Sequence, residues 1–340
     1  MPGGRGAWPK PEATEAPVVK KKTYEIVEED LHAEEGGGYT LGFAGQGMTG
    51  KTISAMTLGK LRMDNIENLR KNGLEYLAKA LEDGSIPYIN KVVVIESENA
   101  MKKQMGRPLE RKILYDVIPI TKRIHIPIAN REMDIATSGA EITKESIENI
   151  QMASEMYADA IEMLANEVDN HTLVILDSAS RYKLLLDAKA TILAAIAGQG
   201  MTEEAQKKES GRIWGNRNEW WQTSMILLRG IPGWVVATFM EEEVSKWVLD
   251  MNEKSVLKGT AKRMDPVKRI EAPRTLFNFD MMYHFELDPF THVITAGVES
   301  GRYAKRGEGC EEYNKQIIDV KDEFSFLRLL DRMVKLFYDD

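Results

Sequence analysis

The sequence contains only one cysteine, Cys310, among its 340 residues. A single cysteine excludes an intrachain disulfide framework and a cysteine-rich zinc site, and it fits a reducing cell interior. Long hydrophobic runs are missing as well, since the longest helical apolar stretch, residues 192–197, is far too short to cross a bilayer. These absences lead us to expect a cytoplasmic protein that does not enter a membrane.

The chain also has no excess of positive charge. Its 45 lysines and arginines face 53 aspartates and glutamates, and the net charge is −8. This balance excludes a general attraction for nucleic acid or for an anionic membrane, so any DNA contact must come from a local basic surface. Hydrophobic residues make up 43%, as in an ordinary globular protein long enough for one large domain or two smaller ones.

Alternating strand and helix patterns predict an α/β fold with a mainly parallel central sheet flanked by helices. Compact apolar segments predict strands at residues 91–96, 173–176 and 233–239, and a late hairpin at 281–286 and 292–298. Weaker apolar segments predict further strands at residues 23–27 and 123–128. Helices are expected at residues 52–61, 64–81, 219–228 and 322–338, and from Thr143 onward with Thr143 as its N-cap.

Both ends of the chain differ from this core. Residues 1–22 are rich in proline and glycine, end in three lysines and lack the apolar core of a signal peptide, so we expect a flexible tail. Residues 23–310 are expected to form the main domain. Residues 311–340 are expected to add an amphipathic C-terminal helix with Phe324, Leu327 and Leu330 on one side.

The most informative motif is G-x-x-x-x-G-K-T, which directly follows a β-favouring segment. It consists of Gly45, Gln46, Gly47, Met48, Thr49, Gly50, Lys51 and Thr52. Glycines allow successive backbone N–H groups to point at a polyanion, and a helix that begins at Lys51 adds the positive end of its dipole. The motif therefore predicts a phosphate-binding loop. No N/T-K-x-D guanine motif is apparent, which favours ATP over GTP.

The chemistry of such a loop assigns a role to two of its residues and requires a third. Lys51 is expected to reach the β- and γ-phosphates, and the Thr52 hydroxyl to ligate Mg²⁺. A carboxylate at the tip of a hydrophobic strand must complete the Mg²⁺ shell. Asp177 directly follows the apolar residues 173–176 and is the candidate.

Hydrolysis also needs a carboxylate that activates water. Many motor NTPases place a glutamate directly after the magnesium-associated Asp, but this chain has Ser178 there. Glu98 is the candidate base, because it follows the strand at 92–95, which we expect to border the phosphate-loop strand. Glu96 is the other candidate for the base. In the simplest alternative, neither residue is catalytic and both are solvated acids at the end of a strand.

These segments resemble the core of the RecA-type recombinases. Residues 92–100, V-V-V-I-E-S-E-N-A, are similar to the RecA strand that ends in acid-x-Glu, in which that Glu is the catalytic base. Residues 173–178 resemble the RecA magnesium strand. The resemblance covers roughly residues 39–300 and includes compact phage and archaeal RecA-like proteins. It implies a RecA-like P-loop ATPase that uses ATP and Mg²⁺ and assembles as a homo-oligomer or filament.

The resemblance implies two further roles near the nucleotide. RecA carries an Asn-Gln sensor of the γ-phosphate at the end of the strand that corresponds to residues 233–239. Here Thr238 is either a substitute sensor or a plain structural residue. By the same resemblance, Arg302 and Lys305 are candidates for a basic finger that reaches a neighbouring subunit's γ-phosphate, and the alternative is a basic surface turn.

One segment has the local positive charge that a DNA contact requires. Residues 244–274 contain eight basic and four acidic residues, a net charge of +4, and RecA-like proteins place a mobile DNA-binding loop there. Trp247 is a candidate to stack on a base of single-stranded DNA. Including Glu241, Glu242 and Glu243 lowers the net charge to +1, and a solvated loop is the alternative. A second loop is expected at residues 182–210.

Other conspicuous residues have ordinary interpretations. None of the five histidines forms a ligand cluster, and His284 and His292 are expected to be ordinary strand residues. Trp220 and Trp221 are expected in the core or in a subunit contact rather than beneath a nucleotide.

The leading hypothesis is an ATPase that acts on single-stranded DNA in recombination, repair or replication. The first alternative is a P-loop kinase that phosphorylates a small molecule and uses residues 244–274 as its lid. The second is a nucleotide-binding module that assembles with other proteins without hydrolysis.

Overall fold

The computed structural model describes residues 38–98, 122–128, 135, 142–242, 247–248, 262–263, 268–269, 278–288, 290–301 and 315–338, all within the unit Glu35–Asp340. The predicted tail at residues 1–22, the strand at 23–27 and Cys310 lie outside the described residues. Among the described helices, none combines the length and apolar character that crossing a membrane requires.

A nine-stranded sheet forms the centre of this unit, in the order β11-β10-β9-β1-β5-β4-β2-β3, with β8 paired to β5. The six strands from β9 to β3 in this order run parallel, whereas β8, β10 and β11 are antiparallel to their neighbours. The strands are β1 Thr40–Gly45, β2 Lys91–Glu96, β3 Lys122–His125, β4 Thr172–Asp177, β5 Trp234–Glu242, β8 Lys268–Arg269, β9 Met281–Leu287, β10 Ile294–Gly301 and β11 Gln316–Ile317. The predicted α/β class with a mostly parallel sheet is confirmed.

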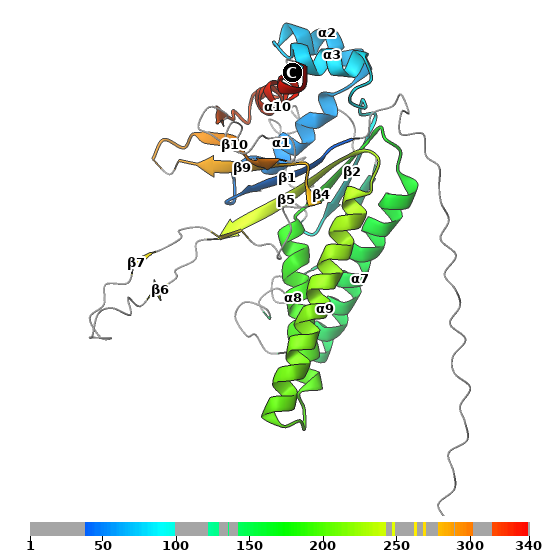
Figure 1. Cartoon of the computed structure of the whole chain (residues 1–340), viewed down its shortest axis with the longest axis vertical. Coiled ribbons are helices and arrows are strands. Elements are labelled where there is room, and N and C mark those ends of the chain that lie inside the picture. Colours follow the sequence, from blue (N-terminus) through cyan, green and yellow to red (C-terminus); the bar gives the residue numbers. More distant parts are fainter. Residues whose placement is uncertain are drawn as a thin grey trace, which may run out of the picture. The chain divides into compact units, whose positions relative to one another are not determined.

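Helices cover both faces of the sheet, which is why the central strands are apolar on both sides. In β4, Leu173 and Ile175 belong to the core beneath α1, α3 and α10, while Val174 and Leu176 belong to the core beneath α7, α8 and α9. Figure 1 shows these two helical layers above and below the strands. The helices are α1 Lys51–Thr57, α2 Ile66–Lys71, α3 Glu75–Glu82, α7 Lys144–Glu167, α8 Ala179–Ala197, α9 Glu203–Arg229 and α10 Ser325–Tyr338.

Several predicted elements are confirmed. The Thr143 side chain caps α7 by accepting a hydrogen bond from the Ser146 backbone N–H at 3.1 Å. Strands β9 and β10 form the late hairpin. Helix α10 packs its Phe326 ring 4.8 Å from that of Phe43 on β1, so it shares the central core. The expected division at residue 310 stays a prediction.

The predicted single helix at residues 64–81 is wrong. The chain there forms a short 3-10 turn, Met63–Asn65, followed by α2 and α3. Helix α2 ends because Gly73 adopts a left-handed φ of 77° and the Leu74 N–H turns back to the Leu69 carbonyl at 3.0 Å. This is a helix end terminated by glycine. The sequence pattern did not reveal it, because the helical spacing of apolar residues continues on both sides of Gly73.

The loop expected at residues 182–210 is also wrong. Helix α8 follows the N-cap residue Ser178 and runs from Ala179 to Ala197, and α9 begins at Glu203. The segment is rich in alanine and leucine, which favour helix. Two of its lysines are engaged within the helical layer: Lys183 pairs with Asp187, and Lys189 donates to the Ser154 hydroxyl at 3.1 Å.

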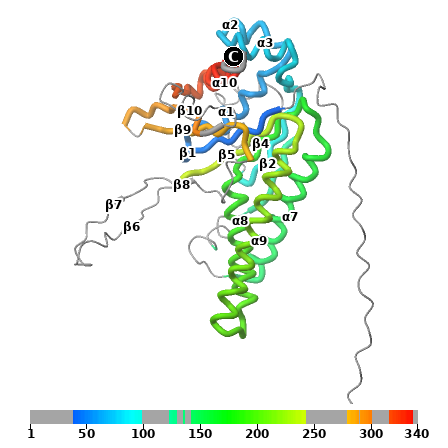
Figure 2. The backbone as a smooth tube through the Cα atoms, viewed as in Figure 1, coloured from blue at the N-terminus to red at the C-terminus, as the bar shows by residue number. Residues whose placement is uncertain are grey.

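The expected contact between β2 and the phosphate-loop strand is wrong too. Strand β1 pairs with β5 and β9, and β5 and β4 lie between β1 and β2. The tube in Figure 2 follows the same order. Strand β2, which follows β1 in the sequence, therefore reaches the site beside β4 and not beside β1.

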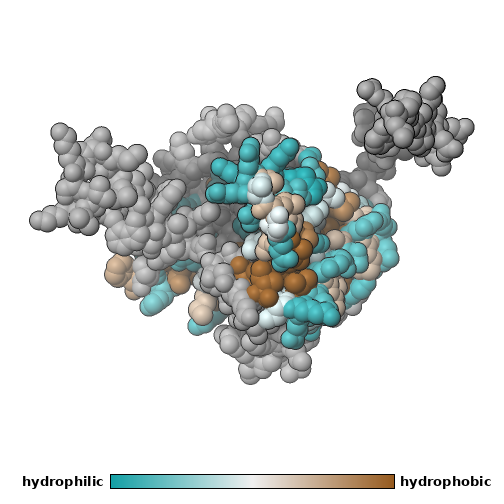
Figure 3. Space-filling view, turned by 90° about the horizontal axis from the view of Figure 1, so that it is seen from below, coloured by the Kyte–Doolittle hydropathy of each residue, from teal (hydrophilic) through white to brown (hydrophobic). Residues whose placement is uncertain are grey.

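Helices α8 and α9 form a long antiparallel pair that extends away from the sheet (Figure 1). Near their connection Leu193, Ile196 and Met201 expose apolar side chains. Figure 3 views the unit from this side and shows apolar surface next to hydrophilic surface. Closer to the sheet the layer is tightly packed, and Trp221 of α9 is fully buried, which confirms its place in the core.

Candidate functional site

The phosphate-loop motif forms a tight connection between β1 and α1. Gly45 has a φ of 149°, and a Cβ atom there would lie 2.2 Å from the Phe285 carbonyl oxygen. Gly50 has a left-handed φ of 78°, and a Cβ atom there would lie 2.8 Å from the Val320 side chain. Both positions require glycine for steric reasons that are independent of any ligand.

Lys51 is folded over this loop. Its Nζ donates to the carbonyl oxygens of Gly45 at 2.8 Å and Gln46 at 2.6 Å, and to the Thr49 hydroxyl at 3.2 Å. Burial lowers the pKa of Lys51 to about 8, against the opposing influence of Asp177 and Glu241. The ammonium group is thus held at the loop by uncharged acceptors, which a polyanion can replace.

Asp177 lies at the centre of the site. Its two carboxylate oxygens accept hydrogen bonds from the Thr52 hydroxyl at 3.0 Å and from the Thr238 hydroxyl at 2.7 Å. These three residues come from α1, β4 and β5, whose relevant ends meet at the carboxyl edge of the sheet. Carboxylate and hydroxyl oxygens are the ligands that Mg²⁺ prefers, so Thr52 and Asp177 fit such an ion.

Burial raises the pKa of Asp177, although the hydrogen bonds from Thr238 and Thr52 act in the opposite direction. The nearby Glu98 carboxylate raises it further, and the Lys51 ammonium lowers it. The charged form of Asp177 therefore lacks sufficient compensation by the surrounding protein. A divalent cation at this position would supply it.

Ser178 has a structural reason to follow Asp177. Its side chain caps α8 by accepting from the Arg181 backbone N–H at 3.3 Å. Ser180, in the first turn of α8, accepts from the Met240 N–H of β5 at 2.8 Å. The two serines fix the start of α8 against the ends of β4 and β5.

The two candidate bases have different surroundings. Glu96 is fully buried and forms an ion pair with Arg123 of β3 at 2.8 Å. Glu98 lies just beyond the end of β2, is 40% exposed at its side chain, and forms an ion pair with Arg181 of α8. Because β2 lies next to β4, Glu98 is close enough to Asp177 to influence its pKa. Of the two acids, Glu98 has the accessible carboxylate.

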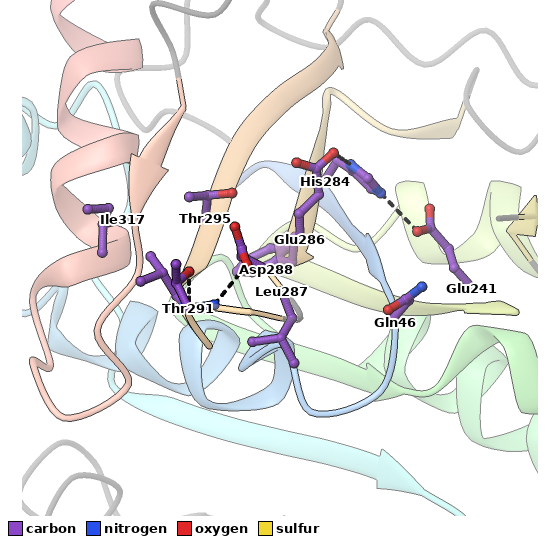
Figure 4. Close-up of a pocket in the computed structure, with 11 residues that line it drawn as sticks. Gln46, Glu241, His284, Glu286, Leu287, Asp288, Thr291, Thr295 and Ile317 are labelled. Carbon is purple, nitrogen blue, oxygen red and sulfur yellow. Dashed lines mark hydrogen bonds and ion pairs between the residues drawn. The ribbon is translucent and has the colours of Figure 1, made fainter. Parts of the chain in front are cut away.

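A cavity of about 570 Å³ opens beside the phosphate loop, between Gln46 and the β9–β10 hairpin (Figure 4). His284 of β9 lies at one end, with its Nε2 2.8 Å from a Glu241 oxygen and its Nδ1 3.3 Å from a Glu286 oxygen. The hydrogen bond to Glu241 is the main reason that the pKa of His284 is raised. His284 is a strand residue, as expected, and it also lies between two carboxylates. His292 lies in the turn between the strands, at a φ of 56°, and not in a strand.

The remaining predicted residues are described in part or not at all. Arg302 and Lys305 lie outside the described residues. Of residues 244–274 the structure describes β6 Trp247–Val248, β7 Lys262–Arg263 and β8. Strand β6 pairs with β7, and β8 aligns Lys268 and Arg269 with Glu242 and Glu241 of β5. Within the described residues no group of three or more potential metal ligands of the His, Cys, Asp and Glu type occurs.

Sequence reasoning missed two features of this site. Arg181 stands four residues after Asp177, and a helix capped by Ser178 was the signal that could have placed it near the strand tips. The Glu241–His284 pair had no such signal, because its strands lie on either side of β1 and 43 residues apart in the chain.

No family model matches the chain, and no curated protein matches its sequence. Among solved structures, the chain is similar to the crystal structure of the RadB recombinase, with 14% sequence identity and a TM-score of 0.35 over 84% of this chain and 90% of that chain. The mixed sheet is consistent with a P-loop fold. A similarity this distant leaves the function to be inferred from the geometry of the site.

Proposed function

We propose that this protein binds ATP with Mg²⁺ and hydrolyses it, as a RecA-like ATPase. The observation that supports this most directly is the convergence of Lys51, Thr52 and Asp177 at the carboxyl ends of β1 and β4. A phosphate loop, a magnesium hydroxyl and a strand-end carboxylate are the minimum that phosphoryl transfer requires from a P-loop protein.

The loop residues receive the phosphates. Backbone N–H groups of the loop and of the start of α1 face the anion, and the Lys51 ammonium moves from the Gly45 and Gln46 carbonyls to the phosphate oxygens. Thr52 and Asp177 would hold Mg²⁺. When bound there, the ion would supply positive charge near the transferred phosphoryl group.

Glu98 orients the attacking water and accepts its proton. Its side chain is 40% exposed, lies near Asp177 and forms an ion pair with Arg181 through Oε1, so water can reach the carboxylate. Glu96 is unsuited to this task because it is buried against Arg123. In the absence of an Asp-Glu sequence, hydrolysis depends on this second strand end.

The cavity beside Gln46 receives the sugar and base. Its acceptors include Glu241, Glu286 and Asp288, which suit ribose hydroxyls and the amino group of adenine. Apolar contact is supplied by Leu287 and Ile317.

The proposal extends to single-stranded DNA and to assembly of several copies, on the basis of charge and of the RecA resemblance. Residues 244–274 have a net charge of +4 in a chain of net charge −8, and that segment is the proposed DNA contact. Arg302 is the proposed finger toward a neighbouring subunit. The proposed division into a tail at 1–22, a core at 23–310 and a C-terminal segment at 311–340 accompanies this assignment.

The test is phosphate release from ATP by the full chain, with and without single-stranded DNA. Lys51→Ala should abolish ATP binding and turnover, and Glu98→Gln should abolish turnover while ATP still binds. Lys91→Ala is the matched control, since Lys91 pairs with Asp169 at the opposite edge of the sheet. Turnover that persists in Lys51→Ala would refute the site. Transfer of phosphate to an acceptor other than water would indicate a kinase, and ATP binding without any turnover would indicate a non-hydrolysing module.

A further inference from the structure

Arg181 is a charged residue at the site for which the motifs provide no role. It lies in the first turn of α8, four residues after Asp177, and only 17% of its side chain is exposed. Its Nε forms an ion pair with the Oε1 of Glu98. A guanidinium cannot lose its proton in a protein, so this positive charge is permanent.

Arg181 is presented by a rigid part of the fold. The backbone around it is fixed by the Ser178 cap and by the hydrogen bond from Met240 to Ser180. Ala179 and Ser180 are fully buried against the sheet. Glu98, by contrast, stands beyond the last residue of β2 and is exposed to solvent.

The Arg181–Glu98 ion pair joins two elements that border the site. Glu98 follows β2, which pairs with β4, and Asp177 is the last residue of β4. Arg181 lies in the first turn of α8, the helix that follows Asp177. The ion pair therefore ties Glu98 to the segment that directly follows Asp177.

We infer that Arg181 is a positioning residue, which holds Glu98 beside Asp177 in the orientation needed to align water. This inference rests on the proposed ATP hydrolysis. Arg181 contacts Oε1 of Glu98 while 40% of the Glu98 side chain stays exposed, so the ion pair fixes the base without enclosing it. Misplacement of a catalytic group by about 1 Å costs about 100-fold in rate, which is the range over which such a contact acts.

The experiment compares steady-state ATP hydrolysis by Arg181→Met, Arg181→Lys, Glu98→Gln and the double variant Arg181→Met/Glu98→Gln. Arg181→Met should lower kcat by about 10- to 100-fold and leave KM and ATP affinity within about threefold. Arg181→Lys should recover part of the loss because it keeps the charge. The double variant should be no slower than Glu98→Gln, because Arg181 acts only through that glutamate.

Arg217→Met is the matched control. Arg217 is also mostly buried and pairs with a carboxylate, Asp187, at 2.9 Å within the α8–α9 layer. Its loss should lower the Tm without changing kcat. If Arg181→Met behaves in the same way, the role of Arg181 is structural and the inference is wrong.

Two other outcomes overturn the inference while the proposed function stands. Turnover by Arg181→Met equal to or above that of the wild type would mean that the ion pair restrains Glu98 rather than positions it. Independent losses in Arg181→Met and Glu98→Gln that multiply in the double variant would mean that Arg181 acts elsewhere. A wild type without turnover in any condition would instead refute the proposed function, and the inference with it.

Discussion

Glu96 and Asp177 occupy equivalent positions on neighbouring strands, since the register of β2 and β4 pairs them directly. Their surroundings are nevertheless opposite. Glu96 is fully buried and has a permanent cation, Arg123, at 2.8 Å. Asp177 is held by two uncharged hydroxyls, from Thr52 and Thr238, and burial raises its pKa.

The difference separates an acid whose charge is balanced by a cation of the protein from an acid that is hydrogen-bonded to uncharged hydroxyls. A buried carboxylate that is already paired with a cation of the protein contributes to the structure and gains little from a bound metal ion. A buried carboxylate held only by hydroxyls is costly to ionise and gains most from a bound cation. Glu241 is an intermediate case, because its partner His284 is a cation only when protonated.

The largest expected effect is that of Asp177→Asn. It should lower kcat by at least about 100-fold, because the proposed Mg²⁺ ligand is lost. Since the pKa of Asp177 is raised, its charged form costs stability as the pH rises from 3.8 through the raised pKa. At neutral pH and without nucleotide, the same variant should therefore have a higher Tm, and its free energy of unfolding should be about 1 kcal/mol larger than that of the wild type.

Asp169→Asn is the control for this trade-off. Hydrogen bonds from Thr172 and Lys91 lower the pKa of Asp169, so its charged form stabilises the fold above its ordinary pKa of 3.8. Asp169→Asn should slightly lower the Tm and leave turnover unchanged, as measured by thermal unfolding and phosphate release. A lowered Tm in Asp177→Asn would contradict the contrast.

The next effect is that of Glu96→Gln, which tests the structural acid. It removes the negative charge that pairs with Arg123 and should lower the free energy of unfolding by about 2 kcal/mol, less than for a fully buried pair because Arg123 is 29% exposed. Denaturant unfolding measures the loss, and turnover per folded molecule should stay within a few-fold. A loss of turnover comparable to that of Asp177→Asn would make Glu96 the functional acid instead.

A smaller effect is expected from Thr238→Val, which removes one of the two hydroxyls that hold Asp177. The variant should need about 10-fold more Mg²⁺ for half-maximal turnover, because groups that orient a metal ligand contribute to metal affinity in that range. Thr238→Ser keeps the hydroxyl and should behave like the wild type. Equal Mg²⁺ titrations for all three proteins would remove Thr238 from the site.

The smallest effect is the pH dependence of the Glu241–His284 pair. Because the pKa of His284 is raised, its stabilisation is fully present below 6.5 and is lost as the pH rises through the raised pKa. The free energy of unfolding of the wild type should fall by less than about 1 kcal/mol across this window, and that of His284→Gln should not show this fall. Parallel Tm-against-pH curves for the two proteins would show that the pair contributes nothing.

Much of the fold is predictable from local sequence because the signals are short-range. The Thr143 cap, the apolar strands at 91–96 and 173–176, and the late hairpin each depend on neighbouring residues. The break at Gly73 and the helices across residues 182–210 were missed for two reasons. The apolar period that continues on both sides of Gly73 hides the glycine-terminated helix end. The second loop was expected from the RecA resemblance, because it follows the magnesium strand, but the chain forms α8 and α9 there.

The sequence by itself predicted the ligand class, because the glycines, Lys51 and Thr52 are contiguous and their geometry follows from local backbone conformation. It also placed Asp177 at a strand tip. Only the tertiary structure decided which acids meet, since strand order is a long-range property: β2 lies beside β4, two strands away from β1. That order brings Glu98 and Arg181 to Asp177, buries Glu96 against Arg123, and places His284 with Glu241 beside the loop.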